Sequence, residues 1–227
     1  METNLRPKYK GIIFDLDGVI CSTDKFHYQA WKKMADGMNI YFDEKINNRL
    51  RGVSRMESLE IILERFEGTV SVEEKERLAA CKNEIYVELL NGMAEADLSG
   101  EVKRTMDDLR GMGCLLAIGS SSKNARLILE RLGLENYFDA VSDGTNITKS
   151  KPDPEVFQKA ADYLGLPAGQ CLVVEDAKAG IDAALVGGFD SAGLGEAAAY
   201  EKTVYPLKNF SALKEIRGIG RNESEDV

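Results

Sequence analysis

The fold is decided by the stretch Gly11-Ile12-Ile13-Phe14-Asp15-Leu16-Asp17-Gly18-Val19-Ile20. A short apolar run ends on two carboxylates one residue apart, and this predicts a buried strand with Asp15 and Asp17 at its C-terminal end. Two carboxylates this close repel each other, so either one of them keeps its proton or the pair binds a cation. A polar strand end before a turn is the alternative, but a buried strand that ends on two acids needs a compensating charge.

The composition limits the classes of partner. The 227 residues suffice for a substantial core in one or two domains. A net charge of −9 argues against nucleic acid as a partner, whereas a small phosphorylated substrate needs only local positive charge. No apolar run approaches the roughly 18 residues of a transmembrane helix, and residues 1–10 lack a signal-peptide core. Cys21, Cys81, Cys114 and Cys171 are far apart, as is typical of free thiols. We therefore expect a cytoplasmic protein that binds neither nucleic acid nor a membrane.

Residues 22–92 have the periodicity of helices and contain no convincing strand. In the first of these helices apolar side chains recur every four residues, and Ser22, Thr23 and Asp24 offer an N-cap. The last of them, over about residues 72–91, is expected to carry its apolar residues on one face: Leu78, Cys81, Ile85 and Leu89.

Beyond residue 97 the pattern alternates between strands and helices. Buried strands are predicted at residues 115–118, 140–141 and 171–174, with helical patterns between them. Such alternation is typical of a parallel sheet covered on both faces, and the first strand belongs to the same sheet. The sequence therefore predicts an α/β protein with a Rossmann-like, doubly wound core of residues 1–21 and 93–227. Residues 22–92 are expected to form an inserted α-helical cap domain.

Three of the predicted strands end on side chains that suit metal or phosphate chemistry. These side chains are Asp15, Asp17, Ser120, Glu175 and Asp176. Ligands of open α/β sheets lie beyond the carboxyl ends of the strands, so the five are expected to converge. Four carboxylates at one edge require a cation, and oxygen-only ligands favour a hard ion, with Mg2+ as the default. Lys151, in a fourth connection, would supply positive charge to a phosphoryl group.

The order of these motifs resembles the haloacid dehalogenase-like superfamily of phosphotransferases. The resemblance rests on Asp15-Leu16-Asp17-Gly18-Val19, Ser120, Lys151-Pro152 and Glu175-Asp176 with Ala179-Gly180-Ile181, and on the position of the helical insertion. Within the superfamily the chain resembles the β-phosphoglucomutases over nearly its whole length to about residue 195. The matching stretches are Thr23-(x)3-His27-(x)3-Trp31, Leu50-Arg51-Gly52-Val53-Ser54-Arg55-(x)2-Ser58-Leu59, Cys81-Lys82-Asn83-(x)2-Tyr86 and Ser120-Ser121-Ser122-Lys123-Asn124.

The resemblance implies a role for each matching residue. Asp15 would be the nucleophile that forms an aspartyl phosphate, and Asp17 the general acid and base. Asp15, the Asp17 carbonyl and Asp176 would bind Mg2+, with Glu175 bound to the ion or beside it. The residues implied in holding the transferring phosphoryl group are Ser120, Ser121 and Lys151. Those implied in holding a second phosphate are Arg55, Ser122, Lys123 and Asn124. Those implied in sugar contact or cap specificity are His27, Trp31, Gly52, Val53, Ser54, Ser58 and Lys82.

The reaction implied by the resemblance is the interconversion of β-D-glucose 1-phosphate and glucose 6-phosphate through a β-glucose 1,6-bisphosphate. A sugar-phosphate phosphatase on the same fold, with water as the acceptor, is the first alternative. A non-catalytic sensor of sugar phosphates is a second, although a sensor does not need the general acid Asp17. Contacts of Arg55 and Lys82 with a substrate that spans both domains would couple cap closure to the right substrate. A capped monomer is expected.

Overall fold

Parallel strands form the centre of the structure, a computed structural model that describes residues 8–50 and 53–220. The six strands found among these residues are β1 (Gly11–Phe14), β2 (Leu115–Gly119), β3 (Ala140–Ser142), β4 (Cys171–Glu175), β5 (Asp190–Gly193) and β6 (Tyr205–Pro206). Their order is β3-β2-β1-β4-β5-β6, and every neighbouring pair is parallel. Strand β1 therefore lies between β2 and β4, with Phe14 opposite Ile118 and Val174.

The alternation of side chains along β1 explains why both faces of the sheet are covered. Ile12 and Phe14 join one buried apolar cluster and Ile13 joins another, because successive residues of a strand point to opposite faces. The helices α5 (Gly100–Gly111) and α6 (Ala125–Arg131) pack into the first cluster, together with the short helix η4 (Phe210–Glu215). The helices α7 (Glu155–Leu164) and α8 (Lys178–Val186) pack into the second. The predicted doubly wound α/β core is confirmed.

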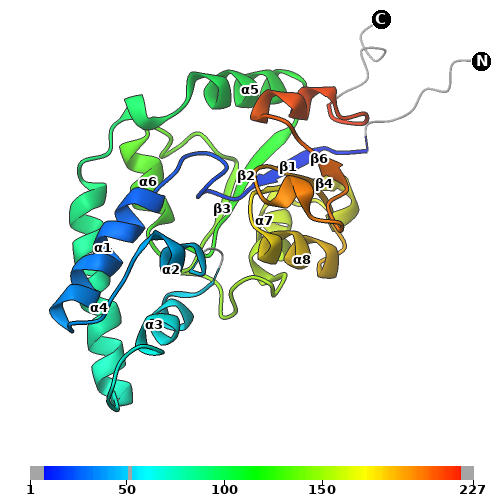
Figure 1. The fold of residues 1–227 in the computed structure, drawn as a ribbon. Helices are drawn as coiled ribbons and strands as arrows, with labels where there is room; N and C mark the ends of the chain where they lie inside the picture. The colour runs from blue at the N-terminus through cyan, green and yellow to red at the C-terminus, as the bar shows by residue number, and fades with distance from the viewer. Residues whose placement is uncertain (1–7, 51–52, 221–227) are drawn as a thin grey trace, which may run out of the picture.

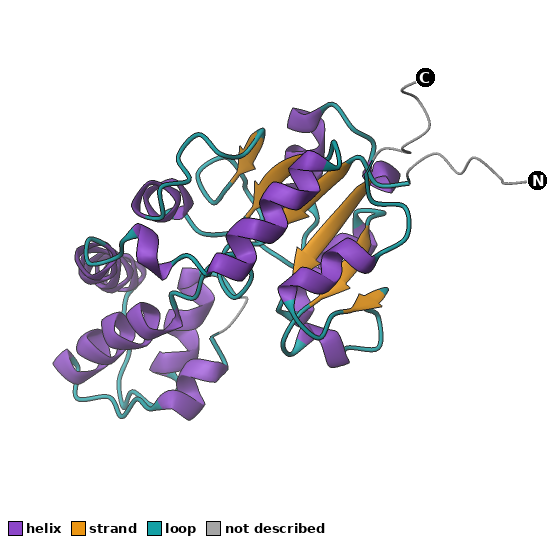
Figure 2. Cartoon of the chain, turned by 90° about the horizontal axis from the view of Figure 1, so that it is seen from above, coloured by secondary structure: helices purple, strands orange, loops and turns teal. Residues whose placement is uncertain are grey.

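Among the described residues, the four α-helices between β1 and α5 form a separate group to one side of the sheet (Figure 1). They are α1 (Asp24–Gly37), α2 (Glu44–Asn48), α3 (Arg55–Leu63) and α4 (Val72–Leu90). Seen from above, the described residues of this part form helices and loops, and no strand is drawn among them (Figure 2). The four helices enclose an apolar cluster of their own, which includes Trp31, Phe42 and Leu59. This second core supports the predicted cap domain, whose limits at residues 22 and 92 stay a prediction.

One local prediction for the cap helices is wrong, and a second is correct in position but not in its hydrogen bond. Along α4 the inward residues are Leu78, Ala79, Lys82, Tyr86 and Leu90, whereas Cys81 is exposed. The buried face of α4 therefore differs from the face predicted from its apolar residues, because the buried face includes a lysine and a tyrosine. At the start of α1, Thr23 is the N-cap residue, but its side chain makes no capping hydrogen bond. Its hydroxyl contacts Asp17 and Tyr86 instead.

The C-terminal part of the sheet was not predicted. Strand β5 consists of Asp190, Ser191, Ala192 and Gly193, and these small or polar residues give no apolar run. Three further short helices are η1 (Glu95–Asp97), η2 (Ala168–Gln170) and η3 (Ala197–Ala199). All four cysteines are free, as predicted, and Cys81 is the exposed one. Within the described ranges, none of the helices combines the length and the apolar character needed to cross a membrane.

Candidate active site

The ends of β1 and β4 bring three carboxylates and one lysine together. Asp15 follows β1 and its backbone N–H donates to Val174 of β4, and Glu175 ends β4. Oxygen atoms of Asp15, Glu175 and Asp176 lie within 4.8 Å of one another. Lys151 donates from Nζ to Asp15 Oδ1 and to Glu175 Oε1, both at 2.5 Å. The predicted convergence of these side chains on one edge of the sheet is present in the structure.

Two glycines leave room for this cluster. A Cβ atom on Gly18, which has a φ of +85°, would lie 2.0 Å from Asp176 Oδ2. A Cβ atom on Gly180, in the first turn of α8, would lie 1.9 Å from Glu175 Oε1. Glu175 is further fixed through Oε2, which accepts from the backbone N–H groups of Asp176 and Ala177 at 3.0 Å each. A side chain at either glycine would therefore displace the Asp176 or Glu175 carboxylate from its place in the cluster.

The charges of this cluster do not balance. Burial, with Glu175 nearby, raises the pKa of Asp176 to about 7. Burial likewise raises the pKa of Asp15 well above its usual value, although the Lys151 ammonium opposes the shift. Burial disfavours the charged form of Lys151, but the Asp15 and Glu175 carboxylates raise its pKa above the ordinary value. One lysine for three carboxylates, two of them buried and that of Asp176 half-buried, leaves an excess of acidic groups at this edge.

A divalent cation fits these residues. The donor set of Asp15, Glu175 and Asp176 consists of oxygen alone, which is the set that Mg2+ prefers. The raised pKa of Asp176 is the expected sign of a carboxylate that lacks a compensating positive charge. An ion at this place would supply that charge.

Asp17 belongs to a different set of contacts, which reaches into the cap. Its Oδ1 accepts from the backbone N–H of Thr23 at 2.9 Å and from Thr23 Oγ1 at 2.5 Å. Thr23 Oγ1 is also 2.8 Å from the hydroxyl of Tyr86 on α4. Burial disfavours the Asp17 carboxylate, but its contacts with His27 and Thr23 lower the pKa of Asp17 below the usual value. Thr23 and Tyr86 matched the family motifs without being assigned a role, and the structure shows that they hold Asp17.

His27 and Lys82 continue this set of contacts. His27 Nε2 lies 3.8 Å from Asp17 Oδ2, which is an ion-pair distance, and the His27 ring stacks on Tyr86. Lys82 Nζ is 2.9 Å from His27 Nδ1 and lies over the rings of Trp31 and Tyr86. The Lys82 side chain is only 2% exposed. Burial and the nearby Arg55 charge lower the pKa of Lys82 to about 7. No carboxylate of the described residues pairs with Lys82, so its buried ammonium lacks a compensating charge that an anion could supply.

The loop after β2 is tightly built. Ser120 is buried, its N–H donates to Ser142 O, and its Oγ accepts from Ser122 N–H at 3.2 Å. Ser121 Oγ is buried and has no hydrogen-bond partner among the described residues. The following loop presses on this one, because a Cβ atom on Gly144 would lie 2.4 Å from Ser121 O. Strand pairing places the loop next to Asp15, since β2 and β1 are neighbours.

A polar junction joins the cap to this loop. Arg55, the first residue of α3, donates from Nη2 to Asn83 Oδ1 at 2.7 Å. Asn124, which precedes α6, donates from Nδ2 to the same Asn83 Oδ1 at 2.9 Å. Arg55 forms no ion pair with a carboxylate of residues 8–50 or 53–220. Asn83 stood in a matching stretch of sequence, but no role was predicted for it.

The remaining predicted residues of the cap loop have simpler surroundings. Ser54 caps α3, since its side chain accepts from Glu57 N–H and the Glu57 carboxylate accepts from Ser54 N–H. Ser58 is buried in α3 and Val53 is exposed. Gly52 lies outside the described residues. Lys123 is exposed and has no ion-pair partner within the described part of the chain.

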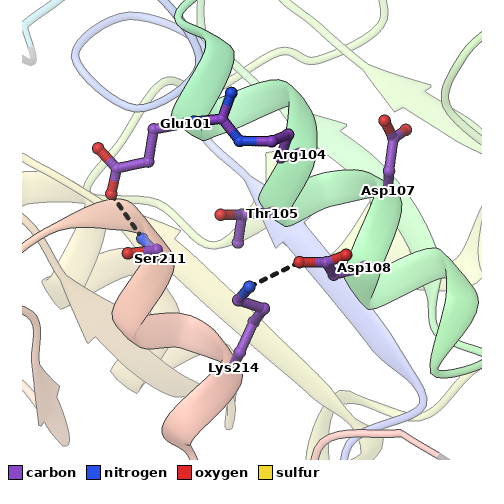
Figure 3. A pocket seen from close by; sticks show the side chains of 7 residues that line it. All are labelled: Glu101, Arg104, Thr105, Asp107, Asp108, Ser211 and Lys214. Atoms are coloured by element: carbon purple, nitrogen blue, oxygen red, sulfur yellow. Dashed lines mark hydrogen bonds and ion pairs between the residues drawn. The ribbon is translucent and has the colours of Figure 1, made fainter.

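A surface pocket of about 480 Å³ lies on other elements, between α5 and η4 (Figure 3). Lys214 Nζ donates to Asp108 Oδ2 at 2.6 Å, and the Glu101 carboxylate accepts from the backbone N–H of Ser211 at 3.0 Å. These contacts tie η4 to α5. The pocket contains none of the predicted site residues.

Comparison with known proteins agrees with this geometry. A β-phosphoglucomutase of Bacillus subtilis (strain 168) is 40% identical over 82% of this chain and 84% of its own length. The fructose-1-phosphate phosphatase YqaB of Escherichia coli (strain K12) is 31% identical over 81% of this chain and 95% of its own. The crystal structure of a β-phosphoglucomutase from Clostridium difficile superimposes with a TM-score of 0.83 at 36% identity, over 90% of this chain and 93% of that one. The family model of the haloacid dehalogenase-like hydrolases matches residues 9–188, and the chain belongs to this family.

Proposed function

We propose that this protein is a Mg2+-dependent phosphotransferase that interconverts β-D-glucose 1-phosphate and glucose 6-phosphate. The observation that carries the proposal is the placement of uncompensated charge on the two sides of the site. The core edge holds excess carboxylate, and the cap holds Arg55 and Lys82 without a carboxylate partner among the described residues. A phosphorylated sugar with its metal ion complements both sides. The β-phosphoglucomutase relatives support the choice of sugar.

In the first half of the reaction, a carboxylate oxygen of Asp15 attacks phosphorus and the bond from phosphorus to the sugar oxygen breaks. Asp17 donates its proton to the leaving sugar oxygen. In the second half, Asp17 takes a proton from the accepting hydroxyl, which attacks the phosphorus of the aspartyl phosphate and releases Asp15. The first half acts on the C1 phosphate of β-glucose 1,6-bisphosphate and releases glucose 6-phosphate. The second half rebuilds the bisphosphate on the C6 hydroxyl of β-glucose 1-phosphate, so the net reaction converts the 1-phosphate into the 6-phosphate.

The metal ion would be held by Asp15, Asp176 and the Asp17 carbonyl, with Glu175 on it or beside it. When bound, it neutralises charge on the transferring phosphoryl oxygens. Lys151 adds a second positive charge, and its contacts with Asp15 and Glu175 support that role. Ser120 and the backbone of Ser121 hold the same phosphoryl group.

The contacts of Asp17 support its role as the acid and base. Thr23 and His27 belong to α1 and its N-cap, and Tyr86 belongs to α4, so the cap orients the carboxyl group. Orientation of the acceptor hydroxyl can contribute roughly 7–11 kcal/mol, which lets a sugar compete with water for the aspartyl phosphate. A cap seated on the core excludes water from the same place.

A sugar-phosphate phosphatase is the second candidate, and the likeness to fructose-1-phosphate phosphatase favours it. In that case water takes the phosphoryl group from Asp15. The same acid, base and metal-binding residues serve both reactions, so the acceptor alone distinguishes them. A cytoplasmic location and a monomeric state remain predictions for either candidate.

One assay separates the candidates. The full chain is given β-glucose 1-phosphate with Mg2+ and a catalytic amount of β-glucose 1,6-bisphosphate, and glucose 6-phosphate and free phosphate are measured in parallel. Glucose 6-phosphate formation that depends on the bisphosphate supports the mutase, and the α-anomer is the matched control. Release of free phosphate without glucose 6-phosphate supports the phosphatase. Binding without turnover of either kind would indicate the sensor.

A further inference from the structure

Asn83 occupies the point at which the cap meets the phosphate-loop side of the core. Its neighbour Lys82 faces His27 and the aromatic rings, whereas Asn83 faces Arg55 and Asn124. Arg55 belongs to α3 of the cap, and Asn124 precedes α6 of the core. Arg55 and Asn124 are 28 and 41 residues away from Asn83 in the chain. One side-chain oxygen therefore joins three distant segments.

The direction of these hydrogen bonds follows from the chemistry of arginine. A guanidinium group has donors and no acceptor, so the atom of Asn83 that faces Arg55 is its carbonyl oxygen. The same oxygen accepts from Asn124 Nδ2, and a carbonyl oxygen has two lone pairs. Both are used within the junction. Among the described residues, the other N–H groups of the guanidinium have no hydrogen-bond acceptor and no carboxylate partner, and these are the groups an anion would meet.

We propose that Asn83 is a positioning residue that aligns Arg55 and Asn124 for the second phosphate of the substrate. The alignment forms only when the cap rests on the core, because the two donors come from opposite sides of the boundary. The inference rests on the proposed function, since it concerns the second phosphate group of a sugar bisphosphate. Asn83 thereby has a role of its own, because its side chain contacts both Arg55 of the cap and Asn124 of the core.

The test uses two substitutions at Asn83 and the same two at a matched position. Asn83→Ala removes the shared acceptor. Asn83→Asp keeps the shape and the acceptor but places a negative charge beside Arg55. Asn91 is the control, because its Oδ1 accepts from Arg131 Nη2 at 2.8 Å and thus also joins the end of α4 to α6. For each full-length variant we would measure kcat and KM for the hexose phosphate, and the Kd of the 1,6-bisphosphate by calorimetry.

We expect Asn83→Ala to raise the KM and the Kd about tenfold while kcat falls by less than about threefold, as for lost hydrogen bonds to a charged group. We expect Asn83→Asp to raise them more, by about 100-fold, because its carboxylate pairs with Arg55 and repels phosphate. A merely structural junction would give the opposite order, since aspartate preserves the hydrogen bonds. Asn91→Ala and Asn91→Asp should leave all three constants within about twofold of the wild type.

Two results would overturn the inference. The first is an Asn83→Asp variant that binds the bisphosphate as the wild type does, and the second is an Asn83→Ala variant that matches Asn91→Ala. If the wild type neither binds nor converts a sugar phosphate, the proposed function itself fails. If the wild type does both and only the Asn83 variants contradict the expectation, the inference alone fails. Thermal unfolding checks that each variant is folded. Should Asn83→Ala not fold, Asn124→Ala breaks the same junction from the core side, and an unchanged Kd there also refutes the inference.

Discussion

The acidic edge of the core and the basic side of the cap carry uncompensated charges of opposite sign. At the core edge Lys151 already contacts Asp15 and Glu175, and the charge left over is negative. In the cap, Arg55 contacts an amide and Lys82 contacts an imidazole, and the charge left over is positive. The core is therefore arranged for a cation and the cap for an anion. Under the proposed function, this difference assigns the chemistry to the core and the choice of acceptor to the cap.

The largest effect should follow from a change on the core side. Asp15→Asn removes the nucleophile, so we expect transfer to a sugar and hydrolysis of p-nitrophenyl phosphate to fall together by about 10⁴-fold or more. Steady-state rates with both substrates provide the measurement. Asp153→Asn, at a half-exposed carboxylate two residues after Lys151, is the control. Transfer that survives in Asp15→Asn would remove Asp15 from the chemistry.

A change on the cap side should separate the two activities. Arg55→Ala removes the half-buried guanidinium, and we expect the ratio of sugar-phosphate conversion to p-nitrophenyl phosphate hydrolysis to fall about 100-fold. The ratio for Arg55→Lys should lie between those of the wild type and Arg55→Ala, because a lysine keeps the charge but lacks the planar fork of the guanidinium. Parallel assays of both substrates measure the ratio. Equal loss of both activities would contradict the proposal that the core performs the chemistry and the cap selects the acceptor.

The contact between the two regions should give a smaller effect. Thr23→Val keeps the side-chain shape and removes the hydroxyl that donates to Asp17, so we expect kcat to fall about tenfold for either substrate. Thr105→Val is the matched control, because Thr105 is equally buried but lies in α5. An unchanged kcat in Thr23→Val would mean that the cap does not orient Asp17.

The smallest effect concerns stability and tests the excess negative charge of the core. The pKa of Asp176 is raised from 3.8 to about 7, so the folded protein without metal binds more protons than the unfolded chain between these values. Stability should therefore fall as the pH rises from about 4 to about 7. Mg2+ binds the ionised carboxylates, and at about 100 times its Kd it should raise the melting temperature at pH 8 by about 5 °C or more.

Melting curves with Mg2+ and with EDTA at pH 5 and pH 8 provide this comparison. Asp176→Asn is the control, and it should lose both the pH dependence due to Asp176 and most of the Mg2+ response. A Mg2+ effect of the same size at both pH values would count against the charge imbalance.

The carboxylates on the core side of the site could be predicted from the sequence because they follow strands. The apolar run before Asp15 and the one before Glu175 mark β1 and β4, and parallel strands bring their ends to one edge. Strand β5 escaped prediction because Asp190 to Gly193 are small or polar, and its place depends on pairing with β4.

The cap side was less accessible to the same reasoning. Periodicity put Cys81 on the inner face of α4, whereas the rings of Trp31 and Tyr86 and the imidazole of His27 bury Lys82. Asn83 accepts a hydrogen bond from Asn124, which is 41 residues away, and no local sequence pattern predicts such a contact. The family motifs identified the residues of the cap, but their geometry arises from tertiary packing.

The exposed thiol of Cys81 has a practical consequence. It stands directly before Lys82 and Asn83, on the solvent side of the helix whose other side buries Lys82 against His27. The remaining three cysteines are buried. A thiol-reactive fluorophore or spin label would therefore attach at one defined place in the native chain, and cap movement during turnover could be recorded in real time without altering a single residue.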